Sequence, residues 1–303
     1  MIYISLEQGN GVFSLTRMKT FAYRQRGLIG LVAALTLLFQ GVPILSAAAK
    51  ATPSLNEIVK ARSVLLIDAA NGKVLFSRNP DEPLPPASTT KLLTALLVYE
   101  HTRLGGQVLV QPSDTNVEPT RIPLRSGETV PVRTLVQSLL ISSENDSAVA
   151  LARHTGGTVD NFLMMMNARA RELGCTGSVF KTPNGLPAQG QVTTAHDLLK
   201  IFHAAMAIPE LRKICETHGM TLKTAIGVQT LTNHNKLLGV YPGMGPAKTG
   251  WTRLSEHTYA ASATRDGHEL HLIILHSPDK WTDAKALFDF GFGQFRGSGK
   301  IAH

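Results

Sequence analysis

The stretch Pro86-Ala-Ser-Thr-Thr-Lys-Leu-Leu-Thr-Ala-Leu-Leu97 places a serine and a lysine at the start of an apolar helix. Prolines and an alanine precede Ser88, which favours an extended chain there, and strong helix formers follow it. Because residues three apart share a helix face, the amine of Lys91 can point towards the Ser88 hydroxyl. A serine becomes a good nucleophile only when a base takes its proton, and a lysine can be that base only when neutral. Alone, the pair is equally typical of a capping serine and a surface lysine.

Two further triplets make the pattern more specific. Ser143-Glu-Asn145 precedes a helical run at 148–154, and Lys248-Thr-Gly250 precedes a hairpin near the end of the chain. Each would be an ordinary helix cap or turn by itself. Together and in this order, S-x-x-K, S-x-N and K-T-G are the signature of the penicillin-interacting serine enzymes.

The flanks of these motifs predict an antiparallel sheet built from both ends of the chain. Residues 63–77 form two apolar runs around Asn71-Gly72, which is a strong hairpin signal. Residues 257–275 repeat the pattern around Asp266-Gly267. Strands at both ends with helices between them indicate one α+β fold whose sheet receives both termini.

The middle of the chain is predicted to be a mostly helical insertion. Candidate helices at 159–173 and 195–208 begin at threonine caps, and another at 280–290 closes the chain. The expected ranges are 55–85 and 240–303 for the sheet, 88–235 for the helical insertion, and 105–131 within it for short strands and loops.

The N-terminus has the pattern of an export signal. Arg24 and Arg26 precede an apolar run at 28–39, and small residues follow at 46–49. We therefore expect residues 1–49 to be a signal peptide that sends the protein to the periplasm or the cell wall. The apolar run is short for a membrane span, but an uncleaved signal anchor is the alternative and would add peripheral membrane contact.

The remaining residues, 50–303, are expected to be a single catalytic domain, and a start at Met18 would give a more usual basic region before the apolar run. The chain is 43% hydrophobic and 17% charged with a net charge of +8, as in a globular protein. No Lys/Arg run is interleaved with aromatics, so nucleic acid is not an expected partner. The two cysteines, Cys175 and Cys215, could pair or be buried thiols. We expect a monomer without metal or cofactor.

The sequence resembles the low-molecular-mass penicillin-binding proteins, the serine D-alanyl-D-alanine carboxypeptidase and endopeptidase family. The resemblance extends over residues 60–295 and implies a β-lactamase/transpeptidase-like fold, with a five-stranded antiparallel sheet flanked by helices. It also implies peptidoglycan peptides as substrates and β-lactams as covalent inhibitors. The blocks that carry it beyond the three motifs are 67–75, 85–100, 138–152, 183–186, 233–238 and 248–252.

The resemblance implies a role for each motif residue. Ser88 would attack the D-Ala–D-Ala carbonyl to form an acyl-enzyme, with Lys91 as its general base. Ser143 would relay the proton to the leaving amine, helped by the charge of Lys248. Asn145 would orient the substrate backbone and the lysine.

The K-T-G-W stretch would bind the substrate. Lys248 and Thr249 would hold the terminal carboxylate, with Gly250 and Trp251 beside them. The backbone N–H groups of Ser88 and Trp251 would form the oxyanion hole.

Two positions depart from the family pattern. Glu144 stands in the second motif where glycine is frequent, and residues 254–257 stand where the family commonly has a glycine. The region around Glu256 would lie near the substrate groove, which puts the donor preference in doubt but not the chemistry. Arg121 and Arg253 could add carboxylate contacts, although a solvated surface arginine is the simpler interpretation of each.

A class A β-lactamase is the nearest alternative, since it has the same fold and motifs. It needs a glutamate in an E-x-x-L-N type loop, and no such string lies between Asn145 and Lys248; Glu172 is at a predicted helix end. An inactive peptidoglycan-binding homologue is a remote alternative, because every nucleophile, base and relay position is filled. The motifs leave open whether the peptidase is a carboxypeptidase or an endopeptidase.

A zinc peptidase is a third alternative. His268-Glu-Leu-His271 lacks the H-E-x-x-H spacing, and residues three apart on a strand face opposite sides. Family members often continue into a β-rich second domain and an amphipathic anchor, whereas this chain ends soon after residues 289–292. We therefore expect a single-domain form without a C-terminal β domain.

Overall fold

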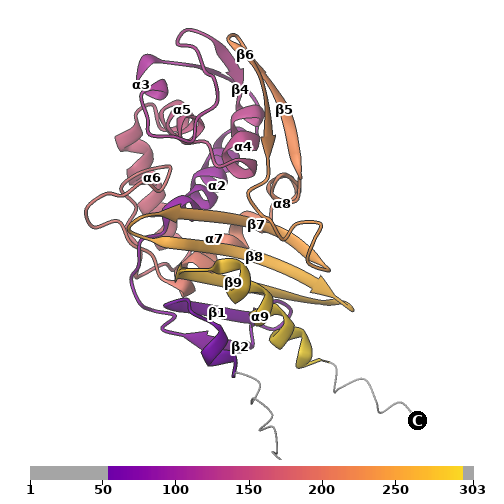
Figure 1. Cartoon of the computed structure of the whole chain (residues 1–303). Helices are drawn as coiled ribbons and strands as arrows, with labels where there is room; N and C mark the ends of the chain where they lie inside the picture. Colours follow the sequence, from indigo (N-terminus) through magenta and orange to yellow (C-terminus); the bar gives the residue numbers. More distant parts are fainter. Residues whose placement is uncertain (1–53, 296–303) are drawn as a thin grey trace, which may run out of the picture. The chain divides into compact units, whose positions relative to one another are not determined.

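The computed structural model describes residues 54–295, and Figure 1 shows their arrangement. A five-stranded antiparallel sheet has the order β2-β1-β9-β8-β7, so strands from both ends of the chain meet in its middle. The expected signal peptide, residues 1–49, lies outside the described residues. The strands of the sheet are β1 (Ser63–Asp68), β2 (Val74–Arg78), β7 (Met244–Thr252), β8 (Glu256–Arg265) and β9 (His268–Ser277).

Both predicted hairpins are present. β1 and β2 flank the Asn71-Gly72 turn, where the Asn71 side chain accepts a hydrogen bond from the Lys73 amide. β8 and β9 are joined by Asp266-Gly267, and both residues have positive φ, at 50° and 79°. Two successive positive φ values suit the right-handed twist of the flanking strands, which is why Asp-Gly is such a strong hairpin signal.

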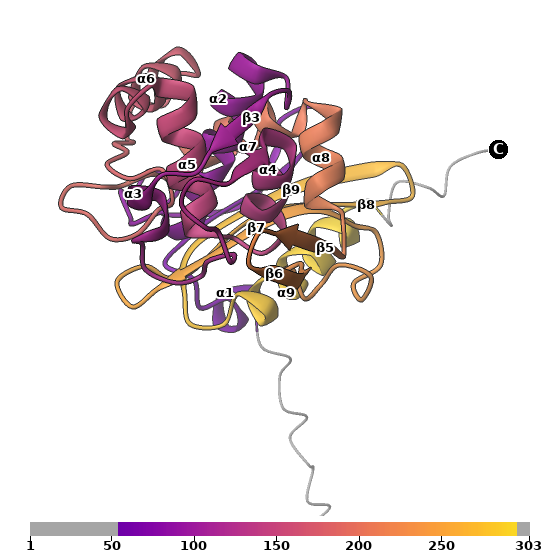
Figure 2. The same ribbon diagram turned by 90° about the horizontal axis from the view of Figure 1, so that it is seen from above.

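The two faces of the sheet belong to two different cores. Along β1, Leu65 and Ile67 pack into the core of the helical part, whereas Val64 and Leu66 pack into a second core on the opposite face. This alternation follows from the two-residue period of a strand, and all four side chains are buried. The helix α7 (Ala195–Met206) contacts the first face, and α9 (Lys280–Gly293) with α1 (Leu55–Ile58) covers the second (Figures 1 and 2).

The helical part surrounds one almost fully buried helix. In α2, Leu92, Leu93 and Val98 are completely excluded from solvent, and the helix contacts α4, α5, α6 and α7. A helix that is apolar on all sides is stable only inside such a shell. Besides α7, the helices of this part are η1 (Ala87–Thr90), the central α2 (Lys91–Thr102), α3 (Pro112–Thr115), α4 (Val132–Ile141), α5 (Asn145–Gly156), α6 (Val159–Glu172) and α8 (Pro209–Cys215).

The predicted helix starts agree with the structure. Thr158 caps α6 by accepting a hydrogen bond from the Asn161 amide, and Thr194 caps α7 through the Asp197 amide. Both helices end one or two residues earlier than predicted, and α9 ends three residues later. One hairpin, β5–β6, was not predicted, because only Leu222 and Leu231 of it are buried. The short strands outside the main sheet are β3 (Gln107–Leu109), β4 (Thr129–Pro131), β5 (Gly219–Thr224) and β6 (Gly227–Thr232).

The two cysteines do not form a disulfide. Cys175 and Cys215 are both free and buried, so the pairing alternative is wrong and the buried-thiol interpretation is confirmed. Burial raises the pKa of both thiols to about 12, which leaves them protonated and poorly reactive at neutral pH. Within residues 54–295, no helix has the length and apolar character to cross a membrane.

Candidate active site

Ser88 lies in a tight turn rather than in the first turn of an α-helix, which corrects the prediction. Residues Ala87–Thr90 form the 3₁₀ helix η1, and Lys91 is the first residue of α2. Side chains three residues apart eclipse one another in a 3₁₀ turn. The Lys91 Nζ accordingly lies 3.0 Å from the Ser88 Oγ, so the predicted juxtaposition holds although the local geometry differs.

A glycine turn packs against this segment. Gly185 has a φ of 83°, and a Cβ atom added to it would lie 1.9 Å from the Ala87 carbonyl oxygen. Only a glycine allows the backbone to pass this close. The same turn is attached to α2, because the Thr94 hydroxyl donates a hydrogen bond of 2.6 Å to the Pro183 carbonyl. The position of Ser88 therefore depends on the block 183–186.

The amine of Lys91 is fully buried among oxygen atoms. Its Nζ lies 2.8 Å from the Ser143 carbonyl oxygen, 3.2 Å from the Ser143 Oγ and 2.7 Å from the Asn145 Oδ1. Burial, followed by the nearby charge of Lys248, holds the pKa of Lys91 well below its usual 10.5, with Glu144 acting in the opposite direction. A lysine in this environment can be neutral and can act as a base.

The second motif forms the turn between α4 and α5. Ser143 has a left-handed backbone with a φ of 67°, and Asn145 begins α5. The Asn145 Nδ2 donates hydrogen bonds to the carbonyls of Glu118 and Pro119, at 3.0 and 2.9 Å. These two contacts fix the orientation of the amide, so its oxygen faces Lys91.

The third motif brings a second buried amine to the same place from strand β7. Lys248 is 1% exposed, and its Nζ donates hydrogen bonds to the Ser143 Oγ at 2.9 Å and to the Thr249 carbonyl at 2.8 Å. Burial lowers its pKa to about 7, and the charge of Glu144 acts in the opposite direction. Ser143 thus stands between two amines that come from different layers of the fold.

Strand β7 lies directly against the turn that carries Ser88. A Cβ atom at Gly250 would lie 2.7 Å from the Ser88 amide nitrogen and 2.4 Å from the Thr258 Oγ1. The close packing at Gly250 therefore requires a glycine at this position of the K-T-G triplet. The Thr258 hydroxyl also donates to the Pro86 carbonyl at 3.0 Å, which ties β8 to the same turn.

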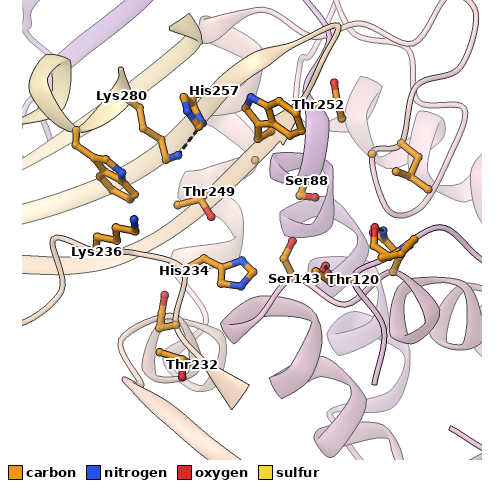
Figure 3. A pocket seen from close by; sticks show the side chains of 18 residues that line it. Ser88, Thr120, Ser143, Thr232, His234, Lys236, Thr249, Thr252, His257 and Lys280 are labelled. Carbon is orange, nitrogen blue, oxygen red and sulfur yellow. Dashed lines mark hydrogen bonds between the residues drawn. The ribbon is translucent and has the colours of Figure 1, made fainter. Parts of the chain in front are cut away.

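A pocket of about 750 Å³ opens over these groups. In Figure 3, Ser88 and Ser143 lie next to each other, with Thr249 on the strand beside them and His234 facing them from a third segment. The amines of Lys91 and Lys248 lie behind this surface. The pocket is lined by Ser88, Pro119, Thr120, Ser143, Asn145, Gly185, Leu186, Thr232, Asn233, His234, Lys236, Thr249, Gly250, Trp251, Thr252, His257, Lys280 and Trp281.

The sequence did not reveal the basic end of this pocket. The Lys280 Nζ lies 2.8 Å from the His257 Nδ1, and the amine also lies over the Trp281 ring at 4.5 Å from its centroid (Figure 3). Burial, and then the charge of Lys236, lower the pKa of Lys280 to about 8. Lys280 belongs to no motif, and only its place at the start of the predicted last helix could have drawn attention to it.

The other candidates raised from the sequence do not line this pocket. Arg121 lines two adjoining hollows, one of which shares Thr120 and His234 with the pocket, and Glu172 is the exposed last residue of α6. His268 is exposed at the start of β9, and His271 is buried against the ring of Phe202. In the part of the chain that the structure describes, no group of three or more His, Cys, Asp or Glu side chains could hold a metal ion.

Residues 47–279 match the peptidase family S11, described as D-alanyl-D-alanine carboxypeptidase. The chain belongs to this family. It is 35% identical over 240 residues to the D-alanyl-D-alanine carboxypeptidase DacB2 of Mycobacterium tuberculosis, and the alignment covers 77% of this chain and 82% of that protein. It is also 32% identical over 242 residues to a D-alanyl-D-alanine endopeptidase of Pseudomonas aeruginosa, which covers 77% of this chain and 76% of the relative.

Solved structures of proteins similar to this S11 family member have the same fold. A D-alanyl-D-alanine carboxypeptidase from Mycobacterium tuberculosis superposes with a TM-score of 0.74 at 34% identity, over 82% of this chain and 95% of that one. The Streptomyces K15 DD-transpeptidase also gives a TM-score of 0.74, at 27% identity, over 80% of this chain and 99% of that one. The predicted family and the predicted fold are both confirmed.

Proposed function

We propose that this S11 peptidase hydrolyses the peptide bond after a D-alanine in peptidoglycan stem peptides, through an acyl-enzyme on Ser88. The observation that carries the proposal is the set of contacts around the buried Lys91 amine. A neutral amine has two N–H donors and one lone pair. The Ser143 carbonyl and the Asn145 amide oxygen, which cannot donate, take the two N–H groups, so the lone pair is left for a hydroxyl. The Ser88 Oγ, at 3.0 Å, is nearer to the amine than the Ser143 Oγ, at 3.2 Å, which already accepts a hydrogen bond from Lys248.

Acylation follows from this arrangement. Ser88 Oγ attacks the carbonyl carbon of D-alanine while its proton passes to the Lys91 amine, and the new Oγ–C bond forms a tetrahedral intermediate. The backbone N–H groups of Ser88 and Trp251 stabilise the negative oxygen. When the C–N bond breaks, the leaving nitrogen takes a proton from the Ser143 hydroxyl, which recovers one from Lys91 or Lys248.

The basic end of the pocket fits the carboxylate of the leaving residue. Thr249 supplies a hydroxyl on the β7 wall, and the Lys280 amine supplies a positive charge on the same pocket. Lys248 is enclosed by Ser143 and the Thr249 carbonyl, so its contribution to carboxylate binding is mainly its charge. The carboxylate role assigned to Lys248 from the sequence is therefore shared with Lys280 in this proposal.

Deacylation uses the same base in the reverse sense. Water attacks the ester carbonyl, Lys91 takes a proton from the water, and Ser88 leaves with a proton. A β-lactam would acylate Ser88 in the same way, but its ring-opened product stays attached to the enzyme and obstructs the water. Activity of this kind belongs outside the cytoplasm, where peptidoglycan lies, in agreement with the export signal expected at the N-terminus.

Three experiments test the proposal. Fluorescent penicillin should label the purified protein covalently, and Ser88→Ala should abolish the labelling; a labelled Ser88→Ala protein would refute the nucleophile assignment. Defined muropeptides then separate the two activities, because a carboxypeptidase removes a terminal D-alanine from monomers and an endopeptidase splits cross-linked dimers. Rapid turnover of nitrocefin, rather than one slow acylation, would instead support the class A β-lactamase alternative.

A further inference from the structure

Glu144 is a buried acid inside the second catalytic motif. It precedes the first residue of α5 and lies between Ser143 and Asn145, which both contact the Lys91 amine. Its side chain is only 3% exposed, although glutamate is among the residues least often buried. A carboxylate is costly to bury unless positive charge or hydrogen bonds compensate for it. The position therefore calls for a physical reason.

Hydrogen bonds do not satisfy both oxygen atoms of the Glu144 carboxyl group. Its Oε2 is inaccessible to solvent and has no hydrogen-bond partner, while Ser142 and Thr120 approach the group from its own turn and from the neighbouring loop. Burial raises the pKa of Glu144 above its usual 4.5, and the Ser142 hydrogen bond and then the charge of Lys91 are the main influences in the opposite direction. The two amines whose protonated forms interact with this carboxylate are those of Lys91 and Lys248, from two different elements.

Few other charged groups face this cluster in the described part of the chain. Asp146 is the second buried acid, and burial raises its pKa to about 7, so below neutral pH it is mostly protonated. Glu144 is then the acid best placed to balance the two amines. The remaining titratable groups around the cluster are Arg121 and His234, which line a hollow with Glu144, and Lys280 and Cys215, which interact with Lys248.

We propose that Glu144 is an internal counter-charge that sets the pH range in which the Lys91–Lys248 pair can acylate Ser88. This inference rests on the proposed function and adds a positioning residue to it. A negative charge beside an amine favours its protonated form, so Glu144 raises the pH at which Lys91 becomes a free base and at which Lys248 loses its charge. Without the charge, the whole active range would move towards lower pH.

The test compares variants that separate the charge of Glu144 from its shape. Glu144→Gln keeps the size and removes the charge, whereas Glu144→Asp keeps the charge and shortens the side chain. The measurement is the second-order rate constant for acylation of Ser88 by fluorescent penicillin, taken between pH 4.5 and 10. We expect Glu144→Gln to move the acid limb of the profile down by about one pH unit. When each protein's rate constant is divided by its own maximum, the variant should then be about fivefold faster than the wild type at one pH unit below the wild-type midpoint.

Controls distinguish this effect from a structural one. Glu144→Asp should keep the acid limb of the wild type even if its maximum falls, and Glu172→Gln, at the exposed end of α6, should leave the profile unchanged. If Glu144→Gln folds poorly, Glu144→Ser gives the same neutral comparison. If Glu144→Gln acylates more slowly at every pH and its acid limb does not shift, the inference about Glu144 is wrong while the proposed function stands. Failure of the wild type to be labelled at any pH would overturn the proposed function and the inference with it.

Discussion

The turn at Gly185 allows a quantitative test of how Ser88 is held in place. A Cβ atom at Gly185 would lie 1.9 Å from the Ala87 carbonyl oxygen, whereas real Cβ contacts essentially never fall below 3.0 Å. In Gly185→Ala, either the turn or the Ala87 carbonyl must therefore move by about 1 Å. Because a misplacement of about 1 Å at a reacting group can cost about 100-fold in rate, we expect acylation of Ser88 to fall by about that factor.

Gly190 provides a matched control for this prediction. It has a similar φ, 77° against 83°, but no atom lies within 4 Å of where its Cβ would be. An alanine at either position bears the same left-handed strain, about 1 kcal/mol, and only Gly185→Ala also meets a clash. The assays are the acylation rate with fluorescent penicillin and thermal unfolding followed by circular dichroism. Equal acylation rates in Gly185→Ala and Gly190→Ala would show that this turn does not position Ser88.

Three further predictions concern other parts of the molecule. Lys280→Met should raise KM for a D-Ala–D-Ala peptide about tenfold, with little effect from Lys285→Met on the exposed face of α9; equal effects would refute the carboxylate role. Burial lowers the pKa of His271 from 6.5, its value in an unfolded chain, to about 4. As the pH falls below 6.5, His271 therefore binds a proton in the unfolded chain before it does so in the folded protein. From pH 7 to 4 the wild type should lose about 3 kcal/mol more unfolding free energy than His271→Phe, and parallel losses in urea titrations would contradict this. Finally, Cys175 and Cys215 should react with a thiol reagent only after denaturation, and reaction in the native state would show that they are accessible.

The hairpins and helix caps could be predicted because local chemistry determines them. Asp266-Gly267 fixes a turn through its own backbone preferences. Thr158 caps α6 by a hydrogen bond to the amide of Asn161, only three residues later in the sequence. The β5–β6 hairpin escaped prediction because most of its side chains face solvent and give a weak apolar pattern. Its tip is held instead by contacts with distant segments, such as the Thr224 hydroxyl donating to the Pro123 carbonyl.

The candidate active site likewise contains some features that the sequence could predict and others that it could not. The three motifs could be recognised because the proposed nucleophile, base and relay must be specific residue types at fixed local spacings. The Lys280 amine and the Gly185 turn could not be assigned a position, because what matters is their approach to His257 and Ala87 from far along the chain. Glu144 was noticed in the sequence only as an unusual residue, and its burial beside two amines is a property of the folded state.

The pairing of β1 with β9 has a consequence for how the molecule is made. Leu65 lies opposite Ile273, more than 200 residues later in the chain, in the centre of the sheet. Contacts between such distant residues form slowly, because a long loop must close before they can be made. A nascent chain therefore cannot complete its sheet, or bring Lys248 to Ser143, until its last strand has been synthesised. The topology therefore delays the assembly of the candidate active site until strand β9 has been made.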